Sequence, residues 1–497
     1  MHATSITRLG ADKRGNPRVW LEGRRLEHAG FTPAARYQLG FDEVKKSITL
    51  RLAANGDRAV SRRSRGDTET PIIDINNSQL LSKFEGIETL KVRFTDGAVI
   101  ISPTASDLRR IERAARLRRR LENGMPLKAG SVSTGLGILS LAIHQGLEAA
   151  GLKAELAFSV EIDERYQEAG MAVNPVWKPE THAVAMPMQE VAFDAQALSS
   201  LPQVDILEAG IPCAAASPAG RAKKSLAKPE DDPKFGHLVA GFLAIVAATN
   251  PGVLLVENVP PFQASSSFSI LVNQLTEWGY IVHADTLKGA DFGCLEYRNR
   301  MALVATTPGI EIDFAALIPD QTEQMKLGDI LEDIPHDDKR WSTMSYLKEK
   351  EDRDLAAGKG FRMKICNETS DFVGTLGRGY SKNRSTEAKV QHPTNPDLLR
   401  LLTPIEHARV KGIPEYLISG LTQTMAHEVL GQSIVFAPFK ALGQHIGSAL
   451  SKWAKLPIEF AASTVKPATI IRALIPQETK PLAQNLGHKD QLPLFAF

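Results

Sequence analysis

Cysteine is scarce in this chain of 497 residues, which contains only Cys213, Cys294 and Cys366, widely spaced and odd in number. The sequence therefore provides neither a disulfide framework nor the paired cysteines of a zinc ribbon, and it predicts no metal site. No apolar run is long enough to span a bilayer, and residues 1–8 lack the apolar segment of a signal peptide. These absences predict a cytoplasmic protein with free thiols and no membrane contact.

Acidic residues are outnumbered in the amino-terminal part of the chain. Residues 1–128 contain 25 Lys and Arg but only 15 Asp and Glu, whereas the remainder contains 34 and 42, so the net charge of +2 hides an asymmetry. A basic segment on a mildly acidic body is typical of an appended module that binds a polyanion, although a solvated charged face has the same composition. The hydrophobic content of 43% is that of a globular protein, and the length allows two to four domains.

Residues 1–104 are predicted to form a basic, β-rich module of the kind that binds nucleic acid. Short strand-like runs, separated by Gly, Asn and Asp turn residues, cover residues 18–21, 47–52, 89–94 and 98–101. Residues 17–33 resemble the small SymE-like and AbrB-like swapped-hairpin proteins, many of which bind nucleic acid. Residues 62–67, which include three arginines, are expected to form a basic loop.

A basic helical connector is predicted over residues 105–128. Ser106 and Asp107 are suited to cap a helix over residues 108–121, and Asn123-Gly124 is suited to end it. The helix carries seven arginines, too many for a single stripe: Arg109, Arg110, Arg113, Arg116, Arg118, Arg119 and Arg120. It is expected either to lie along a phosphate backbone or to be a solvated connector.

From residue 129 strands and helices alternate, which predicts an α/β catalytic domain over residues 129–307, completed by residues 426–455. Gly135-Leu136-Gly137 follows an apolar run and opens a helix, where backbone amides can approach a cofactor. Glu161 ends the next strand, close to the distance at which an acid accepts ribose hydroxyls. Ser140 replaces the third glycine of the dinucleotide fingerprint, so S-adenosylmethionine fits better than a nicotinamide.

Two further apolar strands end in reactive side chains. Cys213 follows the run of residues 204–209, at the sheet edge where open α/β folds bind ligands, although a free cysteine also packs as a small buried residue. Residues 253–259 contain Glu257, a carboxylate that is costly to bury unless it is paired or used. More strands are expected over residues 280–284 and 301–305.

Residues 308–395 lose this regularity and are polar and rich in turns. The Gly, Arg, Lys and Tyr of residues 374–384 suit contact with phosphates and bases, and would equally suit a flexible surface loop. Regular structure resumes at Thr403-Pro404, a helix cap followed by proline, and another helix follows residues 431–434.

Taken in order, these segments resemble the C5-cytosine DNA methyltransferases over roughly residues 130–452. The matching motifs are Ser133-Thr134-Gly135-Leu136-Gly137, Glu161, Gly210-Ile211-Pro212-Cys213 with Ser217, Ala219, Gly220 and Arg221, Glu257-Asn258-Val259, Glu296-x-Arg298-x-Arg300, Arg400-x-Leu402-Thr403-Pro404-x-Glu406-x-Ala408-Arg409, and Gly431-Gln432-Ser433-Ile434. The chain departs from the family's pattern at Ala214, Ala216, Glu296 and Gln432, and residues 182–185 lack the family's Asp near the adenine.

The resemblance implies an α/β fold: a Rossmann-like, S-adenosylmethionine-dependent methyltransferase domain with a β-rich N-terminal extension and a smaller target recognition domain within residues 308–425. It implies that the Cys213 thiolate adds to C6 of a flipped cytosine while Glu257 protonates N3, Arg300 holds O2 and Arg298 braces the same pocket. The cofactor residues it implies are Ser133, Thr134, Gly135, Leu136, Gly137, Glu161, Ile162, Pro212, Gln432 and Ser433. Double-stranded DNA is expected to contact Ser217, Arg221, Lys223, Lys224, Thr375, Leu376, Arg378 and Lys382.

The expected function is therefore that of a bacterial, phage or plasmid DNA cytosine-5 methyltransferase of the restriction-modification type. Two alternatives stay open: an RNA-directed cytosine-5 methyltransferase, and a catalytically weak relic that acts as a DNA-binding regulator. A zinc deaminase also flips bases and carries a Pro-Cys, but position 216 is Ala where that class needs a second cysteine.

The tail of residues 456–497 is Pro-rich and polar, and is expected to be flexible. Gln491, Leu492, Leu494 and Phe495 resemble the peptide by which bacterial replication proteins bind the sliding clamp, with a Gln anchor and apolar side chains that enter a pocket. The sequence thus predicts the sliding clamp as a second partner.

Overall fold

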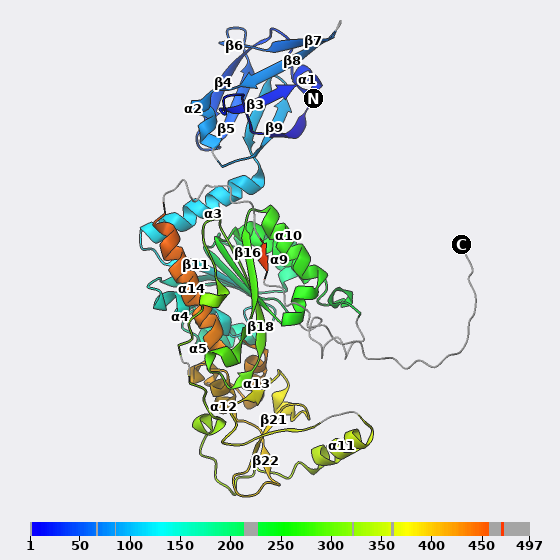
Figure 1. Cartoon of the computed structure of the whole chain (residues 1–497), viewed down its shortest axis with the longest axis vertical. Coiled ribbons are helices and arrows are strands. Elements are labelled where there is room, and N and C mark those ends of the chain that lie inside the picture. The colour runs from blue at the N-terminus through cyan, green and yellow to red at the C-terminus, as the bar shows by residue number, and fades with distance from the viewer. Residues whose placement is uncertain are drawn as a thin grey trace, which may run out of the picture.

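Figure 1 shows the computed structural model, in which a β-rich module, an α/β body and a smaller region follow one another along the long axis. The structure describes residues 2–65, 68–84, 86–212, 227–320, 323–358, 362–456 and 469–471. Within these ranges, none of the helices combines the length and the apolar character needed to cross a bilayer.

Two antiparallel sheets form the amino-terminal module, one in the order β1-β9-β10-β5-β4-β6 and one in the order β2-β3-β8-β7. Their strands are β1 (Ala3–Arg8), β2 (Gly10–Ala11), β3 (Pro17–Glu22), β4 (Arg36–Asp42), β5 (Ser47–Leu52), β6 (Arg58–Ala59), β7 (Ser61–Arg65), β8 (Thr68–Ile75), β9 (Thr89–Thr95) and β10 (Ala98–Pro103), with short helices α1 (Arg24–His28) and α2 (Ser78–Leu81). A single core that includes Val19, Phe31, Leu50 and Val92 fills the module. The four strands predicted from the sequence are confirmed.

The basic loop expected over residues 62–67 is wrong for its first part, because Arg62 and Arg63 belong to β7, which pairs with β8. β7 is an edge strand of its sheet, and charged side chains are tolerated on such strands. Arg62 forms an ion pair with Glu69 of β8 at 2.7 Å, so the neighbouring strand supplies the countercharge that the local sequence did not suggest.

Helix α3 (Ala105–Glu122) joins the module to the body and begins three residues earlier than predicted. Thr104 caps it, because the Thr104 hydroxyl accepts the amide N–H of Asp107 at 3.2 Å. Three of its arginines neither face solvent nor stay free for phosphates, because they donate to backbone carbonyls of the body. Arg113 binds Trp278 and Gly279, Arg116 binds Val204 and Asn250, and Arg118 binds Trp453 and Leu456. The helix is thus fastened to the body.

The body is built on one sheet in the order β13-β12-β11-β14-β15-β18-β16-β23, parallel except for β18, which runs antiparallel between β15 and β16. Its strands are β11 (Leu127–Val132), β12 (Ala154–Glu161), β13 (His182–Ala185), β14 (Ile206–Gly210), β15 (Val253–Asn258), β16 (Ile281–Lys288), β18 (Asn299–Thr306) and β23 (Thr469–Ile471). The strand order reverses between β11 and β14, and open α/β sheets bind ligands at the carboxyl edge of such a point. The predicted Rossmann-like α/β fold is confirmed.

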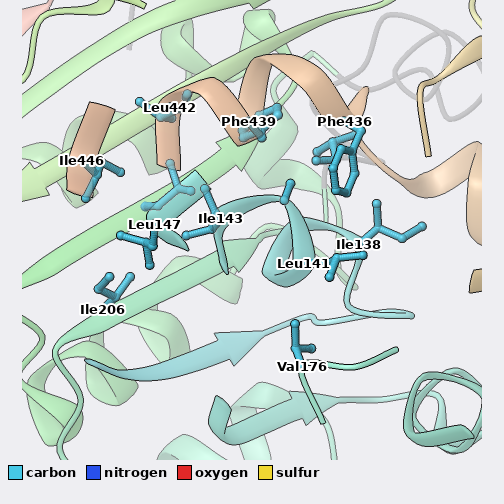
Figure 2. Close-up of a cluster of buried hydrophobic side chains, with 14 of the residues drawn as sticks. Ile138, Leu141, Ile143, Leu147, Val176, Ile206, Phe436, Phe439, Leu442 and Ile446 are labelled. Carbon is cyan, nitrogen blue, oxygen red and sulfur yellow. The ribbon is translucent and has the colours of Figure 1, made fainter. Parts of the chain in front are cut away.

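Helices cover both faces of this sheet and enclose two separate cores. One face carries α4 (Ile138–Ala149), α5 (Glu164–Val173) and α14 (Phe436–Ala454), and the other carries α6 (Met188–Phe193), α7 (Ala195–Ser200), α9 (Leu238–Thr249) and α10 (Ser266–Glu277). Figure 2 shows Ile143 and Leu147 of α4 beside Leu442 and Ile446 of α14. The helices touch at Gly146, where a Cβ would lie 2.2 Å from the Lys440 carbonyl oxygen, so the carboxyl-terminal helix completes the core of the body.

The smaller region has its own apolar core, which includes Leu295, Leu376, Tyr380 and Val390. Its elements are β17 (Glu296–Tyr297), α11 (Ser345–Ala356), β19 (Lys364–Cys366), β20 (Val373–Gly374), β21 (Ala388–Gln391), β22 (Leu399–Arg400) and α12 (Pro404–Val410). The next helix, α13 (Gln423–Gln432), buries Ala426, Val429 and Leu430 in a core of the body. β20 pairs with β17, directly before β18, which holds the region against the body. The predicted Thr403 cap of α12 is confirmed by a capping box with Glu406.

Candidate functional site

The turn after β11 forms a backbone cradle at the switch point of the sheet. Ser133, Gly135 and Gly137 all have positive φ angles of 56°, 55° and 78°, and only the two glycines adopt such angles without a steric cost. The Gly135 amide donates to Glu161 Oε2 at 2.7 Å, and the Asp163 amide donates to Oε1 at 3.0 Å. Each carboxylate oxygen accepts more than one hydrogen bond, so Glu161 keeps acceptor sites for ribose hydroxyls.

The surroundings of the cradle fit a nucleoside. Ile162, directly after Glu161, is 69% exposed, which offers an apolar face for an adenine ring. The Thr134 hydroxyl accepts from Ser159 at 2.8 Å and the Leu136 side chain is buried, so these two residues have only their backbones to offer a ligand.

The two cofactor residues predicted at the end of α13 lie across from α5. The Gln432 amide donates to the Tyr166 hydroxyl of α5 at 3.2 Å. The Ser433 hydroxyl donates to the Leu430 carbonyl at 2.7 Å and so closes the helix end. Gln432 thus contacts the first turn of α5, the helix that follows Glu161, whereas Ser433 bonds within its own helix end.

Glu257 and Arg300 meet at the carboxyl edge of the sheet, from the neighbouring strands β15 and β18. Arg300 Nε lies 2.6 Å from Glu257 Oε1 in a largely buried ion pair. Gly210 at the end of β14 fits between this pair and the cradle, since a Cβ there would lie 3.6 Å from Glu257 Oε2 and 3.7 Å from the Ser133 carbonyl oxygen. Only Gly210 therefore separates the Glu257 carboxylate from the predicted cofactor loop.

Burial controls the ionisation of Glu257. Loss of water around the carboxyl raises its pKa above the ordinary value, although the charges of Arg300 and Arg298 act in the opposite direction. A carboxyl with a raised pKa holds a proton more readily at neutral pH and can donate it to a basic ring nitrogen.

Asn258 positions the segment that precedes Cys213. Its buried side-chain amide donates to the Ile211 carbonyl at 3.2 Å, and its Oδ1 accepts the Val259 amide at 2.8 Å. Pro212 is the last described residue before the nucleophile. Cys213 and the predicted DNA contacts Ser217, Arg221, Lys223 and Lys224 lie outside the described residues, as do Gln491, Leu492, Leu494 and Phe495.

Arg298 turns away from the Glu257–Arg300 pair into a buried network that links three segments. It donates to the carbonyls of Leu376 at 3.4 Å and Gly431 at 3.2 Å, and lies 3.6 Å from the Glu296 carboxylate. These are the contacts of a positioning residue, which ties the strand that carries Arg300 to the recognition region and to α13.

Glu296 is fully buried and forms an ion pair with Lys411 Nζ at 2.5 Å, while its other oxygen accepts the Leu376 amide at 2.8 Å. Burial opposes ionisation of Glu296, but the positive charges of Lys411 and Arg298 outweigh it and lower its pKa. The departure from the Gln of the family's motif is thus matched by a buried lysine.

The residues predicted to contact DNA in the smaller region differ in their surroundings: some are exposed, and others bond to or pack against other parts of the protein. The Thr375 hydroxyl donates to the Tyr297 carbonyl at 2.8 Å, and Lys382 is exposed. Arg378 donates to the Tyr166 hydroxyl at 3.1 Å and lies 3.6 Å from Glu428, so it joins the recognition region to the body. Leu376 is fully buried in the core of the region, and its side chain therefore packs instead of facing a ligand.

The sequence reasoning missed Asn258 as a positioning group and Lys411 as the partner of Glu296. Lys411 stands in the sequence between the apolar residues Val410 and Ile413, and a lone charge in such a setting is a signal of a buried ion pair. Nothing local marks the partner, because Glu296 is 115 residues away.

Comparison with known proteins gives one consistent result. The model of the family described as C-5 cytosine-specific DNA methylase matches residues 131–448. The type II methyltransferase M1.ScrFI of Lactococcus lactis subsp. cremoris is 26% identical over 431 residues, which cover 84% of this chain and 94% of that protein. M.NlaX of Neisseria lactamica, also a type II methyltransferase, is 30% identical over 262 residues, 51% of this chain and 79% of that protein. The Entamoeba histolytica methyltransferase EhMeth shares the fold with a TM-score of 0.50 at 18% identity, over 65% of this chain and 98% of that one.

Proposed function

Since the chain belongs to the family of C-5 cytosine-specific DNA methylases, we propose that its DNA cytosine-5 methylation proceeds through a covalent bond between Cys213 and the target base. The observation that carries the proposal is the Glu257–Arg300 ion pair of 2.6 Å at the sheet edge. This pair lies beside Gly210, and Gly210 is three residues before Cys213 in the chain. The pair supplies a proton donor and a cationic hydrogen-bond donor, and the short distance in sequence from Gly210 to Cys213 supports a nucleophile near them.

The chemistry explains why these three groups are needed. C5 of cytosine is a poor nucleophile, so the Cys213 thiolate forms a bond to C6 while N3 takes a proton, which makes C5 enamine-like. Glu257 supplies that proton, because burial raises the pKa of its carboxyl above the ordinary value. After C5 has gained the methyl group, loss of the C5 proton, departure of the Cys213 thiolate and return of the N3 proton to Glu257 restore the aromatic ring.

Arg300 holds the base and stabilises charge. Its guanidinium beside Glu257 donates to the ring O2, where negative charge develops as the thiolate adds. Asn258 acts one step back, since it fixes the Ile211 carbonyl and with it the direction in which the chain enters Cys213.

The methyl donor is S-adenosylmethionine, which supplies an electrophilic methyl group when it is bound. The residues that would hold it are the backbone of residues 133–137, the Glu161 carboxylate and the exposed face of Ile162. The base itself must leave the duplex stack to reach this edge, because C6 cannot be attacked within the helix.

A methylation assay with labelled S-adenosylmethionine and duplex DNA tests the mechanism. We expect Cys213→Ala to abolish label transfer and Glu257→Gln to lower it by a factor of about 100 to 10,000, the usual contribution of a general acid. Cys294→Ala is the matched control, because that thiol is buried elsewhere in a core and its pKa is raised to about 11 by burial. Equal label with and without Cys213 would refute the covalent route, and bisulfite sequencing of DNA from expressing cells would identify the methylated site.

Two finer proposals concern the ends of the chain. The resemblance of residues 17–33 to swapped-hairpin proteins supports a nucleic-acid-binding role for the amino-terminal module. The peptide with Gln491, Leu492, Leu494 and Phe495, outside the described residues, supports docking on the sliding clamp. Deletion of residues 491–497 should abolish clamp binding and leave methylation of a short duplex unchanged; clamp binding by the shortened chain would contradict the docking role.

A further inference from the structure

Two sets of cations on the strands of the amino-terminal module have different surroundings. On the sheet of β3, β8 and β7, each of three arginines has a carboxylate partner: Arg18 pairs with Asp74 at 2.7 Å, Arg62 with Glu69 at 2.7 Å, and Arg63 with Glu22 at 3.0 Å. The other sheet carries five exposed cations, Arg8, Arg36, Arg51, Lys91 and Arg93. Among the described residues, none of these five forms an ion pair.

The strand register gathers these five cations on one face, here called the basic face. Ile6 is opposite Lys91, Thr4 is opposite Arg93, and Arg51 is flanked by Gln38 and Ala98. The alternate residues of the same strands, such as Leu50, Val92 and Val99, point inward and are fully buried. The hydrophobic core therefore fixes the basic face toward solvent.

Acidic side chains are nearly absent from the strands that form this face. Asp42, at the end of β4, is the single acidic residue in β1, β9, β10, β5 and β4, and its carboxylate is used to accept the amides of Val44 and Lys45. Like charges gathered on one face repel each other. Since no described carboxylate forms an ion pair with these five cations, the arrangement calls for an anionic partner.

We propose that the basic face binds the phosphate backbone of duplex DNA, as a second contact separate from the catalytic site. β1 and β4 are four strand spacings apart, so the cations spread over about 19 Å, a length of duplex that carries about eleven phosphate charges. The face has no aromatic residue in β1, β9, β10 or β5 that points outward, whereas single-stranded nucleic acid is bound mainly by stacking on aromatic rings. Charge without stacking favours a duplex.

The two contacts act together because the module is held in a fixed place. Figure 1 shows the module at one end of the molecule and the recognition region at the other, with α3 between the module and the body. Arg113, Arg116 and Arg118 bind α3 to carbonyls of the body, so the basic face does not swing on a loose linker. A duplex held at the basic face raises the local concentration of sites for the catalytic domain.

Binding of the full-length protein to a random-sequence duplex of about 60 base pairs, measured by fluorescence anisotropy over a range of salt concentrations without cofactor, tests the proposal. Arg51→Gln/Arg93→Gln should weaken binding and lower the slope of log Kd against log salt by about 1.8, because each lost phosphate contact removes about 0.9. The matched control is Arg62→Gln/Arg63→Gln, which removes two arginines of the same module that are paired with carboxylates. The control should keep the wild-type slope.

The outcomes separate this proposal from the catalytic one. A lower salt slope of Arg51→Gln/Arg93→Gln, with an unchanged kcat on a short duplex at saturation, supports a second contact. The binding measurement does not depend on Cys213. An unchanged slope, or an equal change in the control, would overturn the proposal. A variant that loses affinity for single-stranded RNA but keeps wild-type affinity for the duplex would overturn the assignment of duplex DNA as the ligand.

Discussion

Replacing Glu296 by glutamine should leave the buried Lys411 without its countercharge and destabilise the protein. Both side chains are fully buried, and their charged atoms lie 2.5 Å apart. Glutamine keeps an oxygen for the Leu376 amide but carries no charge, so Lys411 must either remain an unpaired buried ammonium or release its proton. Removal of one partner of a buried ion pair costs about 3–5 kcal/mol.

Deprotonation of Lys411 limits this cost and makes it depend on pH. An unfolded lysine has a pKa of about 10.4, so release of its proton at pH 7.5 costs about 4 kcal/mol. The unfolded Glu296→Gln chain then binds one proton more than the native one, and the free energy of unfolding rises with pH by about 1.4 kcal/mol per unit. In wild type, burial lowers the pKa of Lys411 to about 7 even beside Glu296, so wild type keeps the charged pair at pH 6 but also holds a neutral lysine at pH 9. The loss relative to wild type should therefore be larger at pH 6 than at pH 9.

Urea unfolding followed by tryptophan fluorescence at pH 6 and pH 9, on either side of the Lys411 pKa of about 7, measures this effect. The control is Glu296→Gln/Lys411→Met, in which neutral side chains of similar volume replace the pair, and its stability should lie near that of wild type at both pH values. A loss below about 1 kcal/mol for Glu296→Gln at pH 6, or the same loss at both pH values, would refute the reasoning.

Three further substitutions test other contacts. Burial raises the pKa of Glu208 to about 7, so the native state holds a proton that an unfolded glutamate releases near pH 4.3. As the pH rises from 4.3 to 7, the free energy of unfolding of wild type should fall by about 3–4 kcal/mol relative to that of Glu208→Gln, as measured by urea unfolding. Gly431→Ala adds a Cβ only 2.3 Å from the Gly377 carbonyl carbon, and should lower the methylation rate while circular dichroism stays unchanged. Asn258→Ala frees the Ile211 carbonyl, and should lower kcat about 10- to 100-fold, with little change in the KM for S-adenosylmethionine, in steady-state methylation assays.

The sequence was sufficient to predict the sheet. Residues 253–256 are apolar and fully buried on both faces, as expected for a strand between two helical layers, and β15 continues through Glu257 to Asn258. Because parallel strands end at one edge, the order of the motifs in the chain already implied that Glu257 and the cofactor loop converge. The family match of residues 131–448 agrees with that interpretation.

What the sequence could not provide were partners far apart in the chain. Arg118 donates to the Leu456 carbonyl, 338 residues away, and a carbonyl leaves no mark in a sequence because every residue carries one. For that reason the sequence predicted that the arginines of α3 would face solvent or phosphates. The same holds for Arg298, whose carbonyl acceptors on Leu376 and Gly431 distinguish a positioning role from a place beside Arg300.

In the proposed mechanism, the Glu257–Arg300 pair makes proton donation depend on the presence of the base. When the ring O2 shares the Arg300 guanidinium, the charge that favours ionised Glu257 weakens, and its pKa rises toward the value set by burial. Arg300→Gln removes that charge altogether, so the pKa of Glu257 rises. Because catalysis needs the protonated acid, the basic limb of the pH profile of kcat/KM should move to higher pH even though the maximal rate falls. Arg300→Lys keeps the charge and should keep the limb near its wild-type position, and a limb that stays in place in Arg300→Gln would contradict the coupling.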